Sequence, residues 1–299
     1  MKKRSLAVVV CVLAVMNVAS ADIVRGINID FVTIGHAGNP GDTRTGTDEI
    51  GFPLANPYGC GAVGYEYQIG KYEITNAQWN TFTAAAGAPT GNDGGYSYSS
   101  YWTGTQQPTN RVSWYEGLQF CNYLTSGDKS RGVYQFSGNN TNPGDFLGIN
   151  RAAAQTAYGT IYFLPSEDEW YKAAYYTGSG YSTYANGTDV APIAGAETNY
   201  DWAIGRPWNV GTGMQEQNGT FDMMGNVWEW DEALISSLRG IRGGYCGQYC
   251  LSSSSRIGTT QYSEGDAVGF RVASVPEPCS LVLLSLGGLA LLRKVKHVK

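Results

Sequence analysis

Acidic and amide side chains gather in one short segment of the chain, Phe221 to Trp230. Asp222 and Glu229 stand on either side of a Gly225-Asn226 pair, which is typical of a tight turn. Carboxylates and main-chain carbonyls on a turn are the hard oxygen ligands that Ca²⁺ prefers. These residues therefore allow a calcium site, and they equally allow an Asx turn beside a solvated glutamate.

Two cysteines form the second group that could do chemistry. Cys246 and Cys250 follow Gly243-Gly244 closely and have three residues between them. Thiolates are soft ligands that suit Cu(I). The same spacing permits a local disulfide, and either cysteine could instead pair with Cys60. Cys121 falls on an apolar helix face, where a buried core thiol is the simpler interpretation.

Histidine is almost absent, which excludes several kinds of active site. His36 is the only histidine before His297, close to the end of the chain. An HExxH zinc site or a two-histidine iron site cannot be built, and only His36 could serve a Ser–His or Cys–His pair. Glu167 and Glu169 could form a glycosidase-like carboxylate pair, but they fall in the first turn of a predicted helix, where acids stabilise the helix dipole.

The first residues have the pattern of a secretory signal peptide. A basic start, Met1 to Arg4, precedes an apolar run from Leu6 to Val18 and the small residues Ala19-Ser20-Ala21. This order predicts cleavage after Ala21, so that residues 1–21 are a signal peptide. The alternative is a membrane anchor, for which the apolar run is short.

The last residues repeat this logic in reverse. Val275-Pro276-Glu277-Pro278 precedes an apolar run from Leu281 to Leu292, and basic residues follow from Arg293 to Lys299. The basic end is expected on the cytoplasmic side of a membrane. The three parts resemble the PEP-CTERM sorting signal of Gram-negative bacteria. This resemblance implies transient inner-membrane anchoring, processing by an exosortase-type machinery, and delivery to the cell surface or extracellular matrix. A plain C-terminal anchor remains the alternative.

The region between the two ends is strongly acidic. From Asp22 to Glu277 there are 25 acidic and 13 basic residues, which leaves a net charge of −12. Such a body repels phosphate backbones, so nucleic acid is not an expected partner, whereas cations fit the charge better. Residues 22–274 are long enough for one sizeable core and contain no long linker, so they are predicted to form a single domain.

Composition and local signals predict a loop-rich α+β domain. The chain has 40 glycines and 21 tyrosines, with only 15% charged residues. Three capping boxes predict three main helices, because each pairs an N-cap hydroxyl with a Glu or Gln three residues later. The boxes are Thr75 with Gln78, Ser113 with Glu116, and Ser166 with Glu169, and the helices are expected to end at Gly87, Gly127 and Gly178. Short antiparallel strands are predicted at Tyr67–Tyr72, Thr160–Phe163 and Phe270–Ala273.

Six segments, in order, resemble the formylglycine-generating enzyme or sulfatase-modifying-factor family. They are Tyr72–Trp79, Pro108–Cys121, Leu164–Ala174, Asp222–Trp230, Arg242–Gly244 and Gly269–Ala273. The resemblance spans nearly all of the region between Asp30 and Ala273. It implies a loop-rich α+β fold related to C-type lectins.

The resemblance also implies structural calcium. By position, the ligands would be Asp222, the main-chain carbonyls of Gly225 and Val227, and Glu229. A second calcium site would involve Asn199 and Tyr200.

The family's founding activity, as the resemblance implies it, is a Cu(I)- and O₂-dependent oxidation of a cysteine in a sulfatase-type peptide to formylglycine. Cys246 and Cys250 would be the catalytic pair. However, the oxidases separate their two cysteines by four residues, and here only three intervene.

We therefore favour an exported surface or matrix protein that binds an extracellular polysaccharide or a protein ligand. Tyr96, Tyr98, Tyr101 and Trp102 lie in a Gly/Ser-rich stretch whose composition suits adaptable recognition. The oxidase is the alternative.

Overall fold

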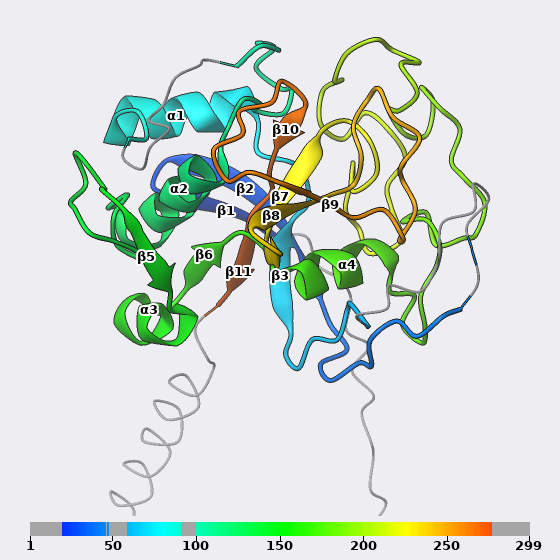
Figure 1. Ribbon diagram of the computed structural model, residues 1–299, viewed down its shortest axis with the longest axis horizontal. Helices are drawn as coiled ribbons and strands as arrows, with labels where there is room; N and C mark the ends of the chain where they lie inside the picture. The colour runs from blue at the N-terminus through cyan, green and yellow to red at the C-terminus, as the bar shows by residue number, and fades with distance from the viewer. Residues whose placement is uncertain (1–19, 46, 48–58, 91–99, 277–299) are drawn as a thin grey trace, which may run out of the picture.

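The first and last strands of the chain belong to one five-stranded sheet (Figure 1). The computed structural model describes residues 20–45, 47, 59–90 and 100–276. The sheet has the order β1-β2-β3-β11-β6, and its four neighbouring pairs are antiparallel. Its strands are β1 (Ser20–Val24), β2 (Ile27–Ile34), β3 (Tyr67–Gly70), β11 (Ala273–Val275) and β6 (Ile161–Phe163).

A second sheet carries the acidic segment. Its order is β10-β7-β8-β9, with β10 parallel to β7 and the other pairs antiparallel. The strands are β7 (Trp228–Ile235), β8 (Leu238–Arg242), β9 (Ile257–Thr259) and β10 (Val268–Gly269). A separate two-stranded ribbon joins β4 (Tyr134–Phe136) and β5 (Phe146–Ile149).

Four helices occur in the described residues. They are α1 (Asn76–Ala86), α2 (Trp114–Ser126), α3 (Arg151–Tyr158) and α4 (Glu167–Tyr175). All three predicted capping boxes are confirmed, because each N-cap hydroxyl and its Glu or Gln partner exchange hydrogen bonds with the main chain. Helices α1 and α2 end before Gly87 and Gly127 as predicted. The α+β fold with short antiparallel strands is thus confirmed.

Several predicted boundaries are wrong. Helix α4 ends at Tyr175 rather than near Gly178, because Tyr176 leaves the helix and forms a bridge with Tyr181. Helix α3 was not predicted, since its cap is a lone asparagine, Asn150, without a Glu or Gln partner. The strand predicted at Phe270–Ala273 begins only at Ala273.

An aromatic core lies under these elements. Trp79 and Phe82 of α1 meet Phe120 of α2 and Phe270, with ring centroids 5.2–6.0 Å apart. All four side chains are at most 2% exposed. Cys121 is fully buried beside them, as its place on the apolar helix face predicted.

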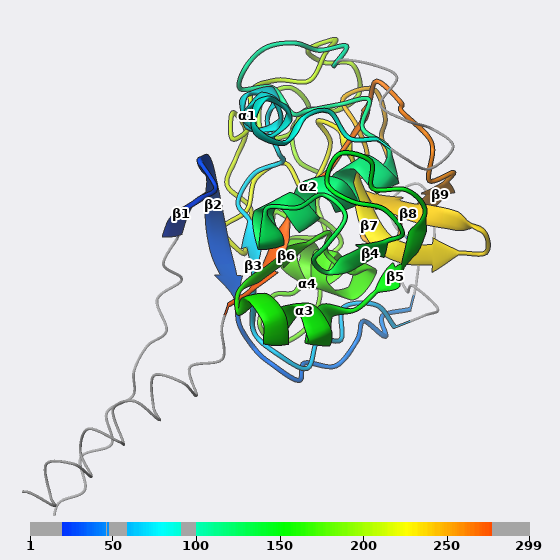
Figure 2. The same ribbon diagram turned by 90° about the vertical axis from the view of Figure 1, so that its left-hand side faces the viewer.

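Long connections occupy one side of the molecule. In Figure 1 the yellow-green connection between α4 and β7 fills the right-hand side, whereas α1, α2 and α3 lie on the left. Figure 2 shows the hairpin β7–β8 reaching away from β1 and β2. Within the described residues, no helix has both the length and the apolar character needed to cross a bilayer. The predicted cleavage after Ala21 would remove two residues that pair in β1 with Asp30 and Phe31.

Candidate functional site

The Gly225-Asn226 turn directs the chain into β7, and its shape requires glycine. Gly225 and Asn226 both have left-handed backbones, with φ of 75° and 59°. A Cβ on Gly225 would lie 2.2 Å from the main-chain oxygen of Asn199. That oxygen accepts a hydrogen bond from the Asn226 amide at 2.8 Å. The turn is therefore pressed against the long connection before it, where any side chain at Gly225 would collide with main chain.

Asn226 connects four distant parts of the chain. Its Oδ1 accepts from the Trp208 amide at 2.9 Å and from Asn199 Nδ2 at 3.1 Å. Its Nδ2 donates to Glu73 at 2.6 Å, and its main-chain oxygen accepts from the Cys246 amide at 3.0 Å. All five of these residues are buried. We call Asn226 and these four partners the hub.

Glu229 forms a closed ion pair with Arg271. Both side chains are fully buried. Arg271 Nε donates to Glu229 Oε2 at 2.6 Å, and Trp170 Nε1 donates to the same oxygen at 2.7 Å. The Arg271 Nη2 group donates to Glu229 Oε1, and the remaining donors reach the main-chain oxygens of Gly70 and Phe221. Both partners are thus satisfied inside the protein.

Three more buried acids surround this pair. Burial raises the pKa of Asp222 to about 6, although hydrogen bonds from the Gly211 amide and from Trp208 oppose the rise. Burial raises the pKa of Glu216 to about 8. Burial, together with the charges of Asp222 and Glu229, raises the pKa of Glu73 well above its ordinary value. Burial therefore opposes the ionisation of all three acids.

The two predicted calcium carboxylates already accept hydrogen bonds from N–H donors. Both carboxylate oxygens of Glu229 accept hydrogen bonds, which come from Arg271 and Trp170. Asp222 accepts from Trp208 Nε1 at 2.7 Å and from the Gly211 amide at 2.8 Å. Asp222 Oδ1, Asp222 Oδ2 and Glu229 Oε1 each accept one N–H donor and keep a further lone pair. Within the part of the chain that the structure describes, no group of three or more His, Cys, Asp or Glu could hold a metal ion. Calcium at this turn stays a prediction.

The second predicted calcium set lies beside the first. Asn199 bridges to Gly225, so the fold brings the two sets together. Asn199 Nδ2 donates to the Arg206 main-chain oxygen and to Asn226, while its Oδ1 is buried without a hydrogen-bond partner. The Tyr200 hydroxyl donates to the Pro192 oxygen at 2.7 Å. This set offers one uncommitted side-chain acceptor.

The two candidate catalytic cysteines lie on the segment that crosses the hub. Cys246 is 2% exposed and Cys250 is half-buried. The chain folds back between them, since a Cβ on Gly244 would lie 2.6 Å from the Cys250 main-chain oxygen. Burial raises the pKa of Cys246 to about 11. Among the described residues, no disulfide joins Cys60, Cys121, Cys246 or Cys250.

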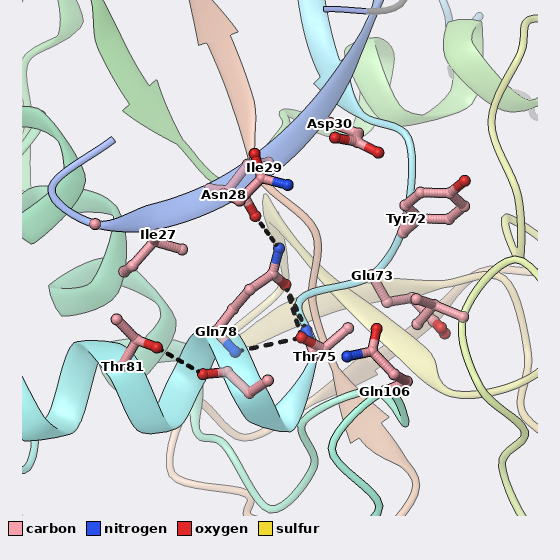
Figure 3. A pocket seen from close by; sticks show the side chains of 13 residues that line it. Ile27, Asn28, Ile29, Asp30, Tyr72, Glu73, Thr75, Gln78, Thr81 and Gln106 are labelled. Carbon is pink, nitrogen blue, oxygen red and sulfur yellow. Dashed lines mark hydrogen bonds between the residues drawn. The ribbon is translucent and has the colours of Figure 1, made fainter. Parts of the chain in front are cut away.

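A polar pocket of about 480 Å³ opens beside the hub, between β2 and the first turn of α1 (Figure 3). Gln78 crosses it, donating from Nε2 to the Asn28 main-chain oxygen at 2.6 Å. Glu73 connects the pocket to the turn, because its carboxylate accepts from Asn226 Nδ2 and from the Val227 amide. No predicted calcium or copper ligand lines this pocket.

A second hollow of about 390 Å³ contains His36, Glu66 and Tyr176. The ring of His36 packs edge-on against Tyr176 at 5.7 Å. His36 thus lies away from the cysteines and the hub residues, none of which lines this hollow.

The predicted recognition loop is only partly described. Tyr96 and Tyr98 lie outside the described residues. Tyr101 is 53% exposed, and its ring packs edge-on against Trp102 at 4.7 Å. The Tyr101 amide donates to Asn110 Oδ1 at 2.7 Å, so a buried asparagine holds the base of this loop.

Sequence reasoning missed Arg271 and Glu73 as partners of the turn. Both lie in segments that carry the family resemblance, Gly269–Ala273 and Tyr72–Trp79. Their place in these segments was the signal that could have identified them as partners of the turn. No local periodicity links either residue to Glu229 or Asn226, because the contacts span 42 and 153 residues of sequence.

Residues 40–275 match the model of the sulfatase-modifying factor enzyme 1-like domain. The "Chaperone protein LppX" of Paenibacillus barcinonensis is 28% identical over 192 residues, which cover 55% of this chain and 61% of that protein. The chain thus spans less than two thirds of the length of this curated relative.

Three solved structures share the fold. The "Treponema denticola variable protein 1" has a TM-score of 0.59 at 20% identity, covering 88% of this chain and all of that one. CarF has a TM-score of 0.58 at 21% identity, covering 84% of this chain and 99% of that one. PvdO from Pseudomonas aeruginosa has a TM-score of 0.58 at 20% identity, covering 84% and 95%. These likenesses confirm the fold class, a loop-rich architecture of the formylglycine-generating-enzyme type related to C-type lectins.

Proposed function

Since the chain belongs to the sulfatase-modifying factor enzyme 1-like family, we propose that it is an exported binding member of that family without oxidase activity. It works at the cell surface or in the extracellular matrix. Its ligand is an extracellular polysaccharide or protein, which it meets with loops held on a rigid body.

The burial and the main-chain hydrogen bonds of Cys246 are the main support for this proposal. Its amide donates to the Asn226 oxygen at 3.0 Å, and its main-chain oxygen accepts from the Trp202 amide at 2.6 Å. The residue is therefore fixed on both sides while its thiol faces the interior at 2% exposure. Cu(I) is held by two thiolates, and a buried thiol fixed on both sides by its main chain is poorly placed to share a metal with the half-buried Cys250. Cys246 thus works better as a packing residue that shapes the loop.

The sequences of the two chain ends support the proposed location at the cell surface or in the extracellular matrix. A signal peptide over residues 1–21 and a PEP-CTERM-like segment over residues 275–299 would export the body, anchor it transiently in the inner membrane, and pass it to an exosortase-type machinery. Residues 1–19 and 277–299 lie outside the described part of the chain. The tail follows β11 directly, and Gln155 Nε2 donates to the Pro276 main-chain oxygen at 3.3 Å beside it.

A copper- and O₂-dependent formylglycine-generating oxidase is the second candidate. One observation favours it: the segment from Gly243 to Cys250 folds back tightly, so both candidate cysteines lie on one short loop. The substrate would be a cysteine of a sulfatase-type peptide. The burial of Cys246 and the three-residue spacing count against this candidate.

One paired assay separates the two candidates. The full-length chain is tested for retention on a panel of extracellular polysaccharides and matrix proteins, and for oxidation of a cysteine-containing peptide under air with added copper. The proposal predicts saturable retention by at least one polymer and no aldehyde product. Aldehyde formation without any retention would reverse it.

A further inference from the structure

Three large apolar side chains are exposed on two connections that meet where the Trp202 amide donates to the main-chain oxygen of Cys246, a hub residue. Trp202 is 54% exposed, Ile204 is 44% exposed and Tyr249 is 64% exposed. They come from two connections, one before the Asp222–Glu229 segment and one after β8. Tyr200 and Tyr245 are half-buried beneath them. We call these five residues the aromatic surface. None of them lines either pocket described above.

Contacts between the two connections keep this surface together. The Tyr200 and Tyr249 rings lie 6.4 Å apart, and the Trp202 and Tyr245 rings lie 5.9 Å apart at 89°. A Cβ on Gly247 would lie 2.5 Å from the Trp202 ring, so the indole packs directly on glycine backbone. Asp201 lies close enough to Tyr249 to raise the pKa of its hydroxyl. The rings are thus presented in a fixed arrangement.

The backbone that exposes Trp202 is strained. Asp201 and Trp202 are consecutive residues with left-handed backbones, at φ of 56° and 55°. This conformation is unfavourable for a bulky side chain, and such strain persists where the surrounding structure enforces it, commonly at binding sites. Here the Trp202 amide is held by the Cys246 oxygen at 2.6 Å. The indole is thus held in one position, with about half of its surface exposed to solvent.

The overall charge of the chain favours one class of partner. From Asp22 to Glu277 the chain carries a net charge of −12, and Asp201 adds a carboxylate between Tyr200 and Trp202. An anionic polymer would be repelled. A neutral pyranose offers aliphatic C–H groups to the negative face of an aromatic ring, and its hydroxyls can donate to a carboxylate or exchange hydrogen bonds with a phenol. Aromatic rings flanked by Asp201 and the Tyr249 hydroxyl match that chemistry.

We propose that the aromatic surface binds a neutral, hexose-based polysaccharide, with the exposed rings of Trp202 and Tyr249 stacking on its sugar rings. This inference rests on the proposed binding function and locates the binding site on the aromatic surface. That place differs from the Tyr96–Trp102 stretch indicated by sequence alone, which supplies an internal control.

The test measures binding of the full-length chain to immobilised neutral polymers (dextran, galactomannan and cellulose) and to alginate as an anionic polymer. The variants are Trp202→Ala, Tyr249→Ala, the conservative Trp202→Phe, and Tyr101→Ala as a matched control. Tyr101 is exposed to a similar degree but belongs to the other loop. Far-UV circular dichroism and melting confirm that each variant is folded.

We expect binding to at least one neutral polymer and none to alginate. Trp202→Ala and Tyr249→Ala should each weaken binding about tenfold or more, while Trp202→Phe and Tyr101→Ala stay close to wild type. Neutral-polymer binding that both alanine variants leave unchanged, or that only Tyr101→Ala lowers, would overturn this inference and leave the binding function standing. Preferential alginate binding, or binding of peptides alone, would overturn the choice of partner. Failure to bind any polymer or protein would overturn the proposed function itself.

Discussion

At the scale of single residues, the interior of this protein is organised by charge. Four acids, Glu73, Glu216, Asp222 and Glu229, are buried around one guanidinium, that of Arg271. Glu229 takes the direct ion pair, while burial raises the pKa of the other three. Arg271 is therefore the buried counter-charge of Glu229.

Replacing Arg271 should be severe. Arg271→Met is expected to lower the free energy of unfolding by about 3–5 kcal/mol, because it leaves the Glu229 carboxylate buried without its counter-charge. Chemical denaturation measures the loss. In the double variant Glu229→Gln/Arg271→Met the stranded charge is gone, so part of the stability should return. A double variant no better than the single one would show that the guanidinium matters for its hydrogen bonds rather than for its charge.

A buried carboxylate in the second capping box predicts a pH effect away from the hub. Burial raises the pKa of Glu116 to about 8, although the Ser113 amide donates to its Oε2 at 2.6 Å. The unfolded chain loses this proton near pH 4.5, so the folded state binds more protons between the two pKa values and stability falls as pH rises through that window.

Glu116→Gln should remove this dependence. The first capping box already uses Gln78 at the same position, so the amide can replace the acid. Relative to wild type, the variant should gain on the order of 3 kcal/mol between pH 5 and pH 8. Urea denaturation at both pH values measures the difference. An equal free-energy change for both proteins would mean that Glu116 is ionised in the folded state at pH 5.

At the scale of elements, capping-box patterns in the sequence predicted the helix starts, because those starts depend on contacts between neighbouring residues. Hydroxyl N-caps with their Glu or Gln partners placed the starts of α1, α2 and α4 correctly. The hairpin β7–β8 was missed, although Trp228 to Ile235 is an eight-residue strand. Its first four residues are all buried, so they lack the alternation of a half-exposed strand, and the strand starts from a turn that Asn199 fixes from a distant loop.

The turn before β7 should be intolerant of a methyl group. Gly225→Ala is expected to cost about 3 kcal/mol, from the left-handed backbone and from the collision with the Asn199 oxygen. Gly26→Ala is the matched control, because Gly26 has a similar φ of 83° with nothing within 4 Å of its Cβ. That control should cost only about 1 kcal/mol. Equal losses in thermal or urea unfolding would place the whole cost in the backbone and none in the contact with Asn199.

At the scale of the whole molecule, the hub around Asn226 and the Glu229–Arg271 ion pair hold the long connections in place. Both join residues that are far apart in the sequence. Family-like segments in a fixed order predicted the α+β fold and its relation to C-type lectins. These segments did not predict the ion pair between Glu229 and Arg271 or the exposure of Trp202. Both features depend on how segments far apart in sequence meet.

Removing divalent cations tests whether the hub needs a metal. We expect the melting temperature in excess chelator to equal that in calcium, because Glu229 and Asp222 already accept N–H donors from Arg271, Trp170, Trp208 and Gly211. Differential scanning fluorimetry is sufficient. A drop of several degrees in chelator, restored by Ca²⁺ alone, would establish the calcium site predicted from the family resemblance.

We propose that the Cys246–Cys250 loop shapes a binding surface and holds no copper. The most direct test of this proposal is an anaerobic Cu(I) titration of the reduced full-length chain, with Cys246→Ser and Cys250→Ser as controls. We predict a Kd weaker than about 1 μM, and one that both substitutions leave unchanged. Tight binding that either serine abolishes would contradict this account and make the oxidase the better reading of the fold.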